Sequence, residues 1–384
     1  MLARYLLVLG ASAALVVGGV GALYAVADPQ GLLGTPPIKG INVTKPYLEY
    51  HRELVRWVMA QRACPSAGVF GNSRAEIGFN PAHPALQPQG ERAFNHAIPG
   101  SAVDLARDQL RWLREAQCPQ RVAVIGLEFM DFLFDANKPV PPVPALRPRP
   151  RVTPQLVLPT MFSLTGLNHA WKTLRAQHVR SAPTVAASGW NPMGSYEGLV
   201  QREGHDALFR QRLDDMRRRL TRGDVRPLEP GTYDYAVLRD VLRDARQAGT
   251  KVILVSYPYH LQLRQLLAAR GLEGALGDWK FEIAKIAEEE GAEFWDFAVV
   301  SRETTEPVPP PRDREPMAGY WEAGHFKREL GDGMLDQVFL GRDGFGVRLK
   351  SGNARMEVEW DQARLRATLR PGANGPTDWP SRLP

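Results

Sequence analysis

Short strand-like runs alternate with helical patterns along this chain, and that alternation constrains its fold more than any other feature. Most of the runs contain an unbroken apolar stretch, such as "AGVFG" at 67–71 and the "VAVIGL" inside "RVAVIGLEF" at 121–129. Strands of this kind are typical of a parallel sheet that helices cover on both faces. The sequence therefore predicts an α/β fold. The predicted strands lie at 67–71, 92–100, 121–129, 251–258 and 292–297.

Helical periodicity fills the intervals between these strands. The chain after residue 342 is only weakly patterned, and we expect "MEVEW" at 356–360 and "LRATLR" at 365–370 to add edge strands. The predicted helices lie at 47–62, after Gly100, near 162–177, at 234–249, at 278–291 and after His325.

Composition divides the chain into segments. The stretch at 28–46 is rich in Gly and Pro, which is typical of a linker. The many prolines of 137–154 argue against regular structure in that segment. Because the pattern stays irregular to about residue 232, we expect 137–232 to form an insertion or lid within one domain. The expected divisions are a transmembrane anchor at 1–27, the linker at 28–46, a domain at 47–341 and a C-terminal extension at 342–384.

The N-terminus carries no charged residue from Tyr5 to Ala27, and Arg4 precedes this stretch. About 20 apolar residues suffice to cross a bilayer as a helix. A cleaved signal peptide is the alternative, because "AVA" before Asp28 has the form of a cleavage site. We favour an uncleaved, single-pass anchor in the cytoplasmic membrane. Both interpretations place the remaining chain in the periplasm or outside the cell.

Charge and motifs exclude several function classes. The net charge of +6 is dilute over 384 residues, and no zinc-ligand spacing or aromatic RNA-binding motif accompanies it, so no nucleic-acid partner is predicted. The basic run at 210–226 also contains acidic residues and reads as a solvated helix face. No phosphate-cradling glycine motif appears. The sequence predicts neither a metal nor a cofactor.

The two cysteines each precede a predicted strand by three residues. Cys64 comes before the strand at 67–71, and Cys118 comes before the strand at 121–129. If those strands are parallel neighbours, both thiols lie at the same end of the sheet, within reach of a disulfide. Such a bridge suits an oxidising compartment. Two free, buried thiols are the alternative.

Ligands of open parallel sheets bind beyond the carboxyl ends of the strands. Ser73 and Gly100 follow the first two strands, and His325 follows the last, with Glu322 three residues before it. A serine nucleophile needs a base, usually a histidine held by a carboxylate, and N–H donors for the oxyanion. These residues could supply each part of such a site.

Each candidate also has a structural interpretation. Ser73 could cap the next helix, Gly100 could serve only a turn, and His325 and Glu322 could be surface residues. His260 also lies at a strand end, where it could bind substrate or make a structural hydrogen bond. Two further strand-end residues could be rival carboxylates or could satisfy the nearby backbone; they are Glu128 and Asp131.

Three segments, "GNSR" at 71–74, "NHAIPG" at 95–100 and "ExxH" at 322–325, resemble motifs of the SGNH (GDSL-like) hydrolase superfamily. The closest resemblance is to its exported, membrane-anchored members related to the alginate O-acetyltransferase proteins. It covers residues 65–340, with the insertion inside. The resemblance implies a flavodoxin-like, three-layer α/β/α sandwich in which the first and third strands are neighbours. That strand order would bring Cys64 and Cys118 together.

The resemblance also implies roles for single residues. Ser73 would be the nucleophile, its own N–H and that of Gly100 would hold the oxyanion, and His325 would be the base. Asn72 and Arg74 would flank the nucleophile and face substrate. Two features depart from the family pattern, and Asn72, which stands where many relatives have Asp, is a milder third change. Glu322 stands where the family usually has Asp, and the strand ending "GLEFMDF" lacks the family's oxyanion Asn.

The sequence thus predicts an exported, serine-dependent acyl-ester enzyme, either an O-acetyltransferase or an esterase. Its expected partners are an acyl donor and a cell-envelope or extracellular polysaccharide. The alternative is a non-catalytic, membrane-tethered component of a polysaccharide or envelope assembly machinery, with protein partners in that envelope. The altered Asp and the missing Asn favour the alternative, whereas Ser73 and His325 favour the enzyme.

Overall fold

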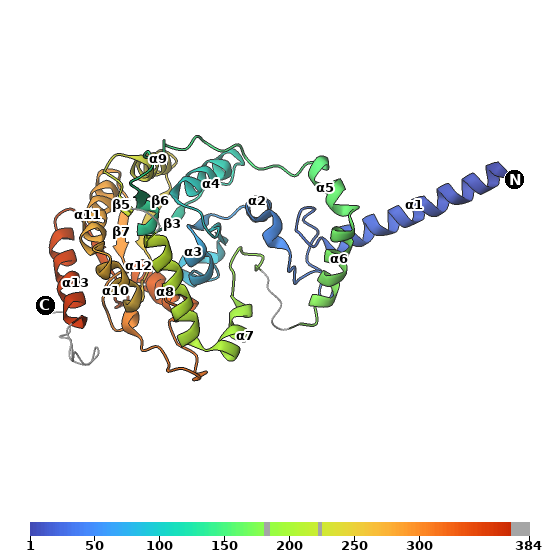
Figure 1. Cartoon of the computed structure of the whole chain (residues 1–384). Coiled ribbons are helices and arrows are strands. Elements are labelled where there is room, and N and C mark those ends of the chain that lie inside the picture. The colour runs from blue at the N-terminus through green and yellow to red at the C-terminus, as the bar shows by residue number, and fades with distance from the viewer. Residues whose placement is uncertain (180–184, 222–224, 370–384) are drawn as a thin grey trace. The chain divides into compact units, whose positions relative to one another are not determined.

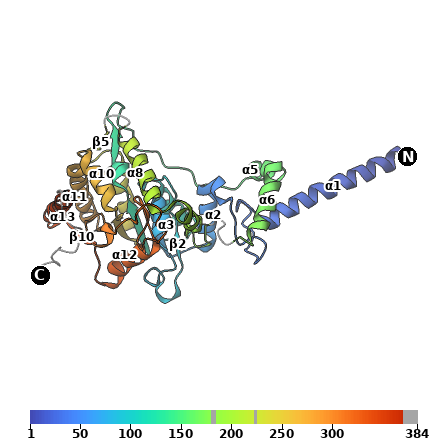
Figure 2. The ribbon, with the colours of Figure 1, turned by 60° about the horizontal axis from the view of Figure 1, so that its bottom comes forward.

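The computed structural model describes residues 1–179, 185–221 and 225–369, and these residues form two compact units (Figure 1). The helical unit comprises Met1–Arg62, Pro148–Ala187 and Asn191–Gly198. The α/β unit comprises Ala63–Arg147, Ser188–Trp190 and the chain from Leu199 onward. Figure 2 shows the same ribbon from a second direction.

A six-stranded sheet forms the centre of the α/β unit. Its strand order is β10-β7-β6-β3-β1-β2, and all neighbouring pairs are parallel except β10 with β7. The predicted α/β fold with a mostly parallel sheet is confirmed. The strands are β1 Ala67–Phe70, β2 Ala93–Asn95, β3 Val122–Leu127, β6 Lys251–Ser256, β7 Glu293–Asp296 and β10 Val347–Leu349.

The handedness of the connections assigns the helices to the two faces of the sheet. Three crossovers, from β2 to β3, from β3 to β6 and from β6 to β7, all run across the sheet towards β10. Because crossovers between parallel strands are right-handed, the helices of these three connections lie on the same face of the sheet. The crossover from β1 to β2 runs the opposite way and carries α3 over the other face, where α12 packs against it. The helices of the first face are α4 Val103–Glu115, α9 Tyr233–Gln247 and α11 Glu273–Glu289, and those of the second are α3 Ser73–Gly78 and α12 Arg328–Leu340.

Burial explains why the strands could be located from sequence. Every residue of β1 and β3 is buried, and in β6 only Lys251 is exposed. Strands sealed between two helical layers have no solvent-facing side, so their runs stay apolar without alternation.

The C-terminal part of the chain differs from the prediction. Residues 356–360 and 365–368 lie in a helix, α13 Ala354–Thr368, and the edge strand is β10. Asp361 of this helix is buried, where it pairs with Lys280 and Arg264. The described part of 342–384 therefore belongs to the α/β unit and is not an extension.

The remaining elements complete the α/β unit. An antiparallel pair of β4 and β5, which are far apart in the chain, and a hairpin of β8 and β9 stand apart from the main sheet. Their bounds are β4 Leu133–Asp135, β5 Val225–Pro227, β8 Tyr320–Glu322 and β9 His325–Phe326. The other elements are α8 His205–Thr221, α10 Leu261–Ala269, η2 Pro84–Leu86, η3 Pro88–Gly90, η4 Phe129–Phe132 and η5 Glu303–Thr305.

The helical unit revises the expected linker. Asp28 ends α1 in the left-handed conformation and is fully buried, and its carboxylate accepts from the N–H groups of Leu33 and Thr35. Lys45 pairs with the same carboxylate, so residues 28–46 fold back on the helix end instead of forming an open linker. The helices of this unit are α1 Leu2–Ala27, η1 Leu48–His51, α2 Arg52–Ala63, α5 Pro154–Met161 and α6 Leu164–Ala176, and α7 Gly194–Glu203 begins in it.

The expected single insertion is divided between the two units. Residues 148–187 group with α1 and α2, whereas α8 and β5 group with the sheet. The helix predicted at 47–62 also belongs to the helical unit and not to the sheet domain. Proline-rich sequence reveals where regular structure lapses, but it does not reveal which core the next helix joins.

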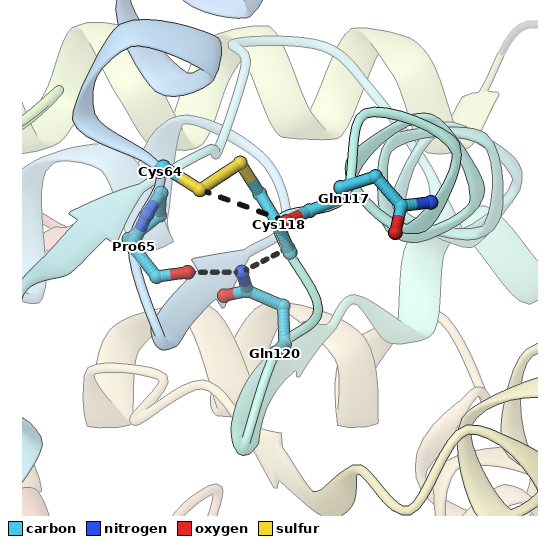
Figure 3. Close-up of a disulfide and its surroundings, with 5 residues drawn as sticks. All are labelled: Cys64, Pro65, Gln117, Cys118 and Gln120. Carbon is cyan, nitrogen blue, oxygen red and sulfur yellow. Dashed lines mark hydrogen bonds between the residues drawn. A yellow bond between two sulfur atoms is a disulfide. The ribbon is translucent and has the colours of Figure 1, made fainter.

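The predicted bridge between Cys64 and Cys118 is confirmed (Figure 3). Their Cα atoms lie 5.1 Å apart, because β1 and β3 are parallel neighbours and both cysteines precede them. The Gln120 side chain reinforces the junction by donating to the carbonyl of Pro65 at 2.7 Å and to that of Cys118 at 3.3 Å. The disulfide closes the amino-terminal edge of the sheet.

The N-terminal apolar helix is also confirmed. α1 has 26 residues, and its most apolar window has a mean hydropathy of 2.3 and is not buried in the protein. By length and composition this helix is able to cross a membrane.

Candidate active site

The nucleophile candidate lies at the carboxyl end of β1, beside the point where the strand order reverses. Asn72 caps α3, with its Oδ1 accepting from the Arg74 N–H at 3.0 Å, so Ser73 is the first residue of the helix and not its cap. Gly71 has φ 137°, and a Cβ there would stand 2.3 Å from the Tyr257 hydroxyl. Only glycine fits this turn, which exposes Ser73 at the sheet edge.

Ser73 and His325 meet although 252 residues separate them in the chain. The Ser73 hydroxyl donates to Nε2 of His325 at 2.8 Å. His325 begins β9, and the hairpin with β8 brings Glu322 beside its ring, where Nδ1–H donates to Glu322 Oε1. A hydroxyl, an imidazole and a carboxylate therefore form one hydrogen-bonded chain.

Glu322 is buried but held in its charged form. Its second oxygen accepts from the Gly324 N–H at 2.7 Å, and the Arg212 Nε lies 3.7 Å from that oxygen. Burial acts to raise the pKa of Glu322, but His325, Arg212 and the Gly324 N–H outweigh it and bring the pKa below its usual value. An ionised carboxylate fixes the tautomer in which Nε2 of His325 is free to accept a proton.

The surroundings of His325 keep its ring neutral. Burial lowers its pKa, and the positive charges of Arg212 and Arg74 add to this, while Glu322 acts in the opposite direction. The net direction is downward from an ordinary histidine. At neutral pH the ring is therefore available as a general base.

Arg74 faces the protein instead of serving only as a substrate contact. Its Nε donates to the Gly324 carbonyl, and its guanidinium pairs with Glu128. It also lies over the rings of Tyr257 and Tyr259, at 5.8 and 5.3 Å from their centroids. Arg74 thus ties the serine turn to the histidine turn and to the end of β3.

Glu128 and Asp131, the rival carboxylates, do not meet His325. Glu128 pairs with Arg74 and accepts from the Tyr259 hydroxyl, which makes it a structural partner. Asp131 lines the cavity beside the serine, and burial together with the charge of Asp234 raises its pKa to about 7.

A cavity of about 480 Å³ opens over Ser73 and His325. Residues of the expected insertion form part of its wall, because α8 and Val225 of β5 contribute to it; β4, which pairs with β5, adds residues from before the insertion. Its polar lining includes Asn72, Gly100, Ser101, Asp131, Asp135, Arg212 and Arg219, and its apolar lining includes Met130, Leu133, Phe134, Met216 and Leu220.

Two backbone N–H groups and one side-chain amide of residues that line this cavity have no acceptor in the described structure. Among the described residues no acceptor binds the backbone N–H of Ser73 or of Gly100. Gly100 has φ 79°, and apart from its own chain neighbours no described atom lies within 4 Å of where its Cβ would stand. The capping bond of Asn72 uses its oxygen, which leaves the Nδ2 donors without an acceptor in the described structure. Asn72 thus offers an amide donor in a site whose third strand supplies none.

His260 does not line the cavity. It is buried and caps α10, where Nδ1 accepts from the Gln262 N–H at 3.2 Å and Nε2 donates to the Glu306 carbonyl at 2.9 Å. Both ring nitrogens are engaged. The structural interpretation therefore replaces the prediction that His260 binds substrate.

Arg212 is the principal site residue that the sequence did not reveal. It lies in the basic run that predicted a solvated face, and Arg217 and Arg218 in that run are indeed exposed and paired with Asp214 and Asp215. The spacing of the residues on the opposite face could have identified Arg212, because three of them follow it at helical intervals and line the cavity with it. They are Met216, Arg219 and Leu220.

Comparison with known proteins returns no match, either to models of protein families or to curated sequences.

Proposed function

We propose that this protein is an exported, membrane-anchored enzyme of the SGNH type that transfers or hydrolyses acyl esters through Ser73. The observation that carries the proposal is the hydrogen-bonded chain from Ser73 through His325 to Glu322. The cavity over this chain gives an ester access to the hydroxyl.

The first half of the reaction forms an acyl-enzyme. Ser73 Oγ attacks the ester carbonyl carbon while its proton passes to His325 Nε2, and the carbonyl oxygen becomes an oxyanion. The N–H groups of Ser73 and Gly100 and the Asn72 amide donate to that oxygen. When the tetrahedral intermediate collapses, the bond to the leaving oxygen breaks, and that oxygen takes the proton from His325.

The second half releases the acyl group. A sugar hydroxyl or a water molecule loses its proton to His325 and attacks the acyl carbonyl, and Ser73 Oγ leaves with the proton returned by the ring. Glu322 stabilises the imidazolium in both halves. The polar lining near the serine, with Ser101 and Asp131, suits a hydroxyl-rich acceptor such as a polysaccharide.

The fold and the compartment support this assignment. The strand order sets β1 beside β3, as the SGNH resemblance implies, and helices cover both faces of the sheet. The apolar α1 supports an anchor, and the disulfide supports an oxidising compartment. N-terminal sequencing of the exported protein tests the anchor, since a start at Asp28 would establish cleavage instead.

A fluorophosphonate probe tests the chemistry. We expect the wild-type protein to be labelled and Ser73→Ala to be unlabelled. Ser351→Ala is the matched control, because Ser351 is exposed and does not line the cavity, and it should label like the wild type. Absence of labelling in the folded wild-type protein would contradict the enzyme and favour the non-catalytic envelope component.

A further inference from the structure

The helical unit exposes large apolar side chains beside the end of α1. In α5 and the turn that follows it, Leu158 and Phe162 are each about half exposed, and in α6 Leu164 and Trp171 are exposed by 87% and 56%. The surface they form is called here the hairpin face. Leu158 and Phe162 are four residues apart and Leu164 and Trp171 seven apart, so each pair shares one helical face. Exposed apolar side chains gathered in this way mark a contact with a partner or a membrane.

The contacts of α1 fix the position of the hairpin along that helix. Residues 2–19 are exposed throughout, and protein contacts begin at Val20 and Gly21. Gly21 packs beside Phe162, and Tyr24 and Ala27 are buried in a cluster with Ala170 of α6. The α5–α6 hairpin therefore grips only the last two turns of α1.

The exposed length of α1 matches the thickness of a bilayer. Eighteen residues at 1.5 Å each span about 27 Å, close to the hydrocarbon thickness of about 30 Å. If residues 2–19 span the bilayer, with Arg4 at the far end reaching out to the opposite headgroup layer, the hairpin begins where the headgroup layer on its own side begins. Its exposed aromatic and aliphatic side chains are then at the depth where such residues are typical.

The charge of the hairpin segment complements an anionic surface. No acidic residue occurs between Asp135 and Glu197. Lys172 and Arg175 are exposed on α6 next to Trp171, and Arg149 and Arg151 precede α5. Basic side chains beside exposed aromatic and aliphatic ones are the signature of a helix that lies on a membrane surface.

We infer that the α5–α6 hairpin lies in the headgroup layer of the bilayer that α1 crosses and binds anionic lipids there. The hairpin face buries its apolar side chains among the lipids, while Lys172 and Arg175 pair with headgroup phosphates. This inference rests on the proposed membrane anchoring and not on the chemistry at Ser73.

Site-specific labelling of the full-length protein in nanodiscs tests the inference. The two native cysteines are joined to each other, so one added thiol takes the label. A fluorophore is placed in turn at Leu164→Cys, Trp171→Cys and, on α1, Leu9→Cys. The fluorescence is then quenched by lipids that carry a nitroxide either near the headgroup or deep in the acyl chain. Iodide in the buffer quenches labels that are exposed to water.

We expect shallow nitroxide to quench the hairpin labels and deep nitroxide to quench the label at residue 9. In nanodiscs with anionic lipid, Lys172→Glu combined with Arg175→Glu should lower the ratio of docked to undocked hairpin by on the order of tenfold. Arg217→Glu combined with Arg218→Glu is the matched charge control and should leave that ratio unchanged.

If only iodide quenches the hairpin labels while deep nitroxide still quenches the label at residue 9, the inference is overturned. The hairpin face would then be assigned to contact with a protein partner. If the label at residue 9 is also quenched only by iodide, the anchor itself fails and the inference falls with it. Neither result touches the proposed chemistry, which the fluorophosphonate reaction tests separately.

Discussion

The two edges of the parallel sheet in the α/β unit are built for different purposes. At the amino edge a disulfide and the Gln120 amide join the starts of β1 and β3. At the carboxyl edge of the same strands, N–H donors stay without acceptors in the described structure, and a cavity stays open over Ser73. One edge holds the strands together, and the other keeps polar groups ready for a ligand. Changes at the two edges should therefore separate stability from activity.

The largest effect should follow loss of either member of the serine–histidine pair. We expect Ser73→Ala and His325→Ala each to lower kcat/KM for a chromogenic acetate ester by about 10⁴- to 10⁶-fold, because one member cannot act without the other. The thermal unfolding midpoint should change little. An active Ser73→Ala protein would show that the residues at the carboxyl edge do not carry out the reaction.

Glu322→Gln should lower kcat by about 10³- to 10⁴-fold. The amide loses the charge that fixes the histidine tautomer and stabilises the imidazolium. Glu322→Asp keeps the charge but withdraws it by one methylene, so its rate should fall between those of the wild type and Glu322→Gln. Equal rates for all three proteins would show that the carboxylate takes no part.

At the amino edge, Cys64→Ala combined with Cys118→Ala should lower the free energy of unfolding by about 4 kcal/mol, because the bridge closes a loop of 54 residues. Urea denaturation measures this change. The ester hydrolysis rate per folded molecule should stay at the wild-type value. If the hydrolysis rate per folded molecule fell along with stability, the amino edge would also contribute to activity, and the two edges would not have separate roles.

Stability also depends on the carboxyl edge through a buried acid. Burial, with the charge of Asp104, raises the pKa of Asp234 to about 7, and neither of its oxygens has a hydrogen-bond partner in the described structure. A raised acid pKa means that its stability contribution is full below the unfolded value and is lost as pH rises towards 7.

Asp234→Asn should therefore raise the free energy of unfolding at pH 8 by about 2–4 kcal/mol and have little effect near pH 4. Urea denaturation at the two pH values measures the difference. A variant that is destabilised at pH 8 would show that the ionised carboxylate has a favourable partner.

The smallest effect concerns the pH dependence of the reaction. Burial is the main cause of the lowered pKa of His325, and the charge of Arg212 adds to it, so Arg212→Met should move the midpoint of the labelling-rate profile upward. Arg212→Lys should keep most of the wild-type midpoint. Arg218→Met is the control, because Arg218 is exposed and pairs with Asp215. An unchanged midpoint in Arg212→Met would make Arg212 only a packing residue.

The sequence predicted the sheet well because each of its strands satisfies one dominant constraint. The runs at 67–71, 121–129 and 251–258 had to be apolar along their central residues, since helices seal both faces, and the structure places β1, β3 and β6 there. The pairing of the cysteines and the meeting of the strand-end residues followed, because parallel strands bring their amino ends to one edge of the sheet and their carboxyl ends to the other.

Elsewhere several constraints compete, and the sequence could not rank them. The alternation in "MEVEW" fits a strand, but the helix is stabilised by the pairing of Asp361 with Lys280 and Arg264. Both His260 and His325 follow strands, yet only the β8–β9 hairpin turns its histidine towards Ser73. Such choices depend on contacts across the chain that local patterns do not record.

Mapping the residue that a fluorophosphonate modifies tests the central claim most directly. Mass spectrometry of digested wild-type protein should find the adduct on the peptide that contains Ser73, and His325→Ala should slow its formation by orders of magnitude. An adduct on another serine, or formation at an unchanged rate in His325→Ala, would contradict the account.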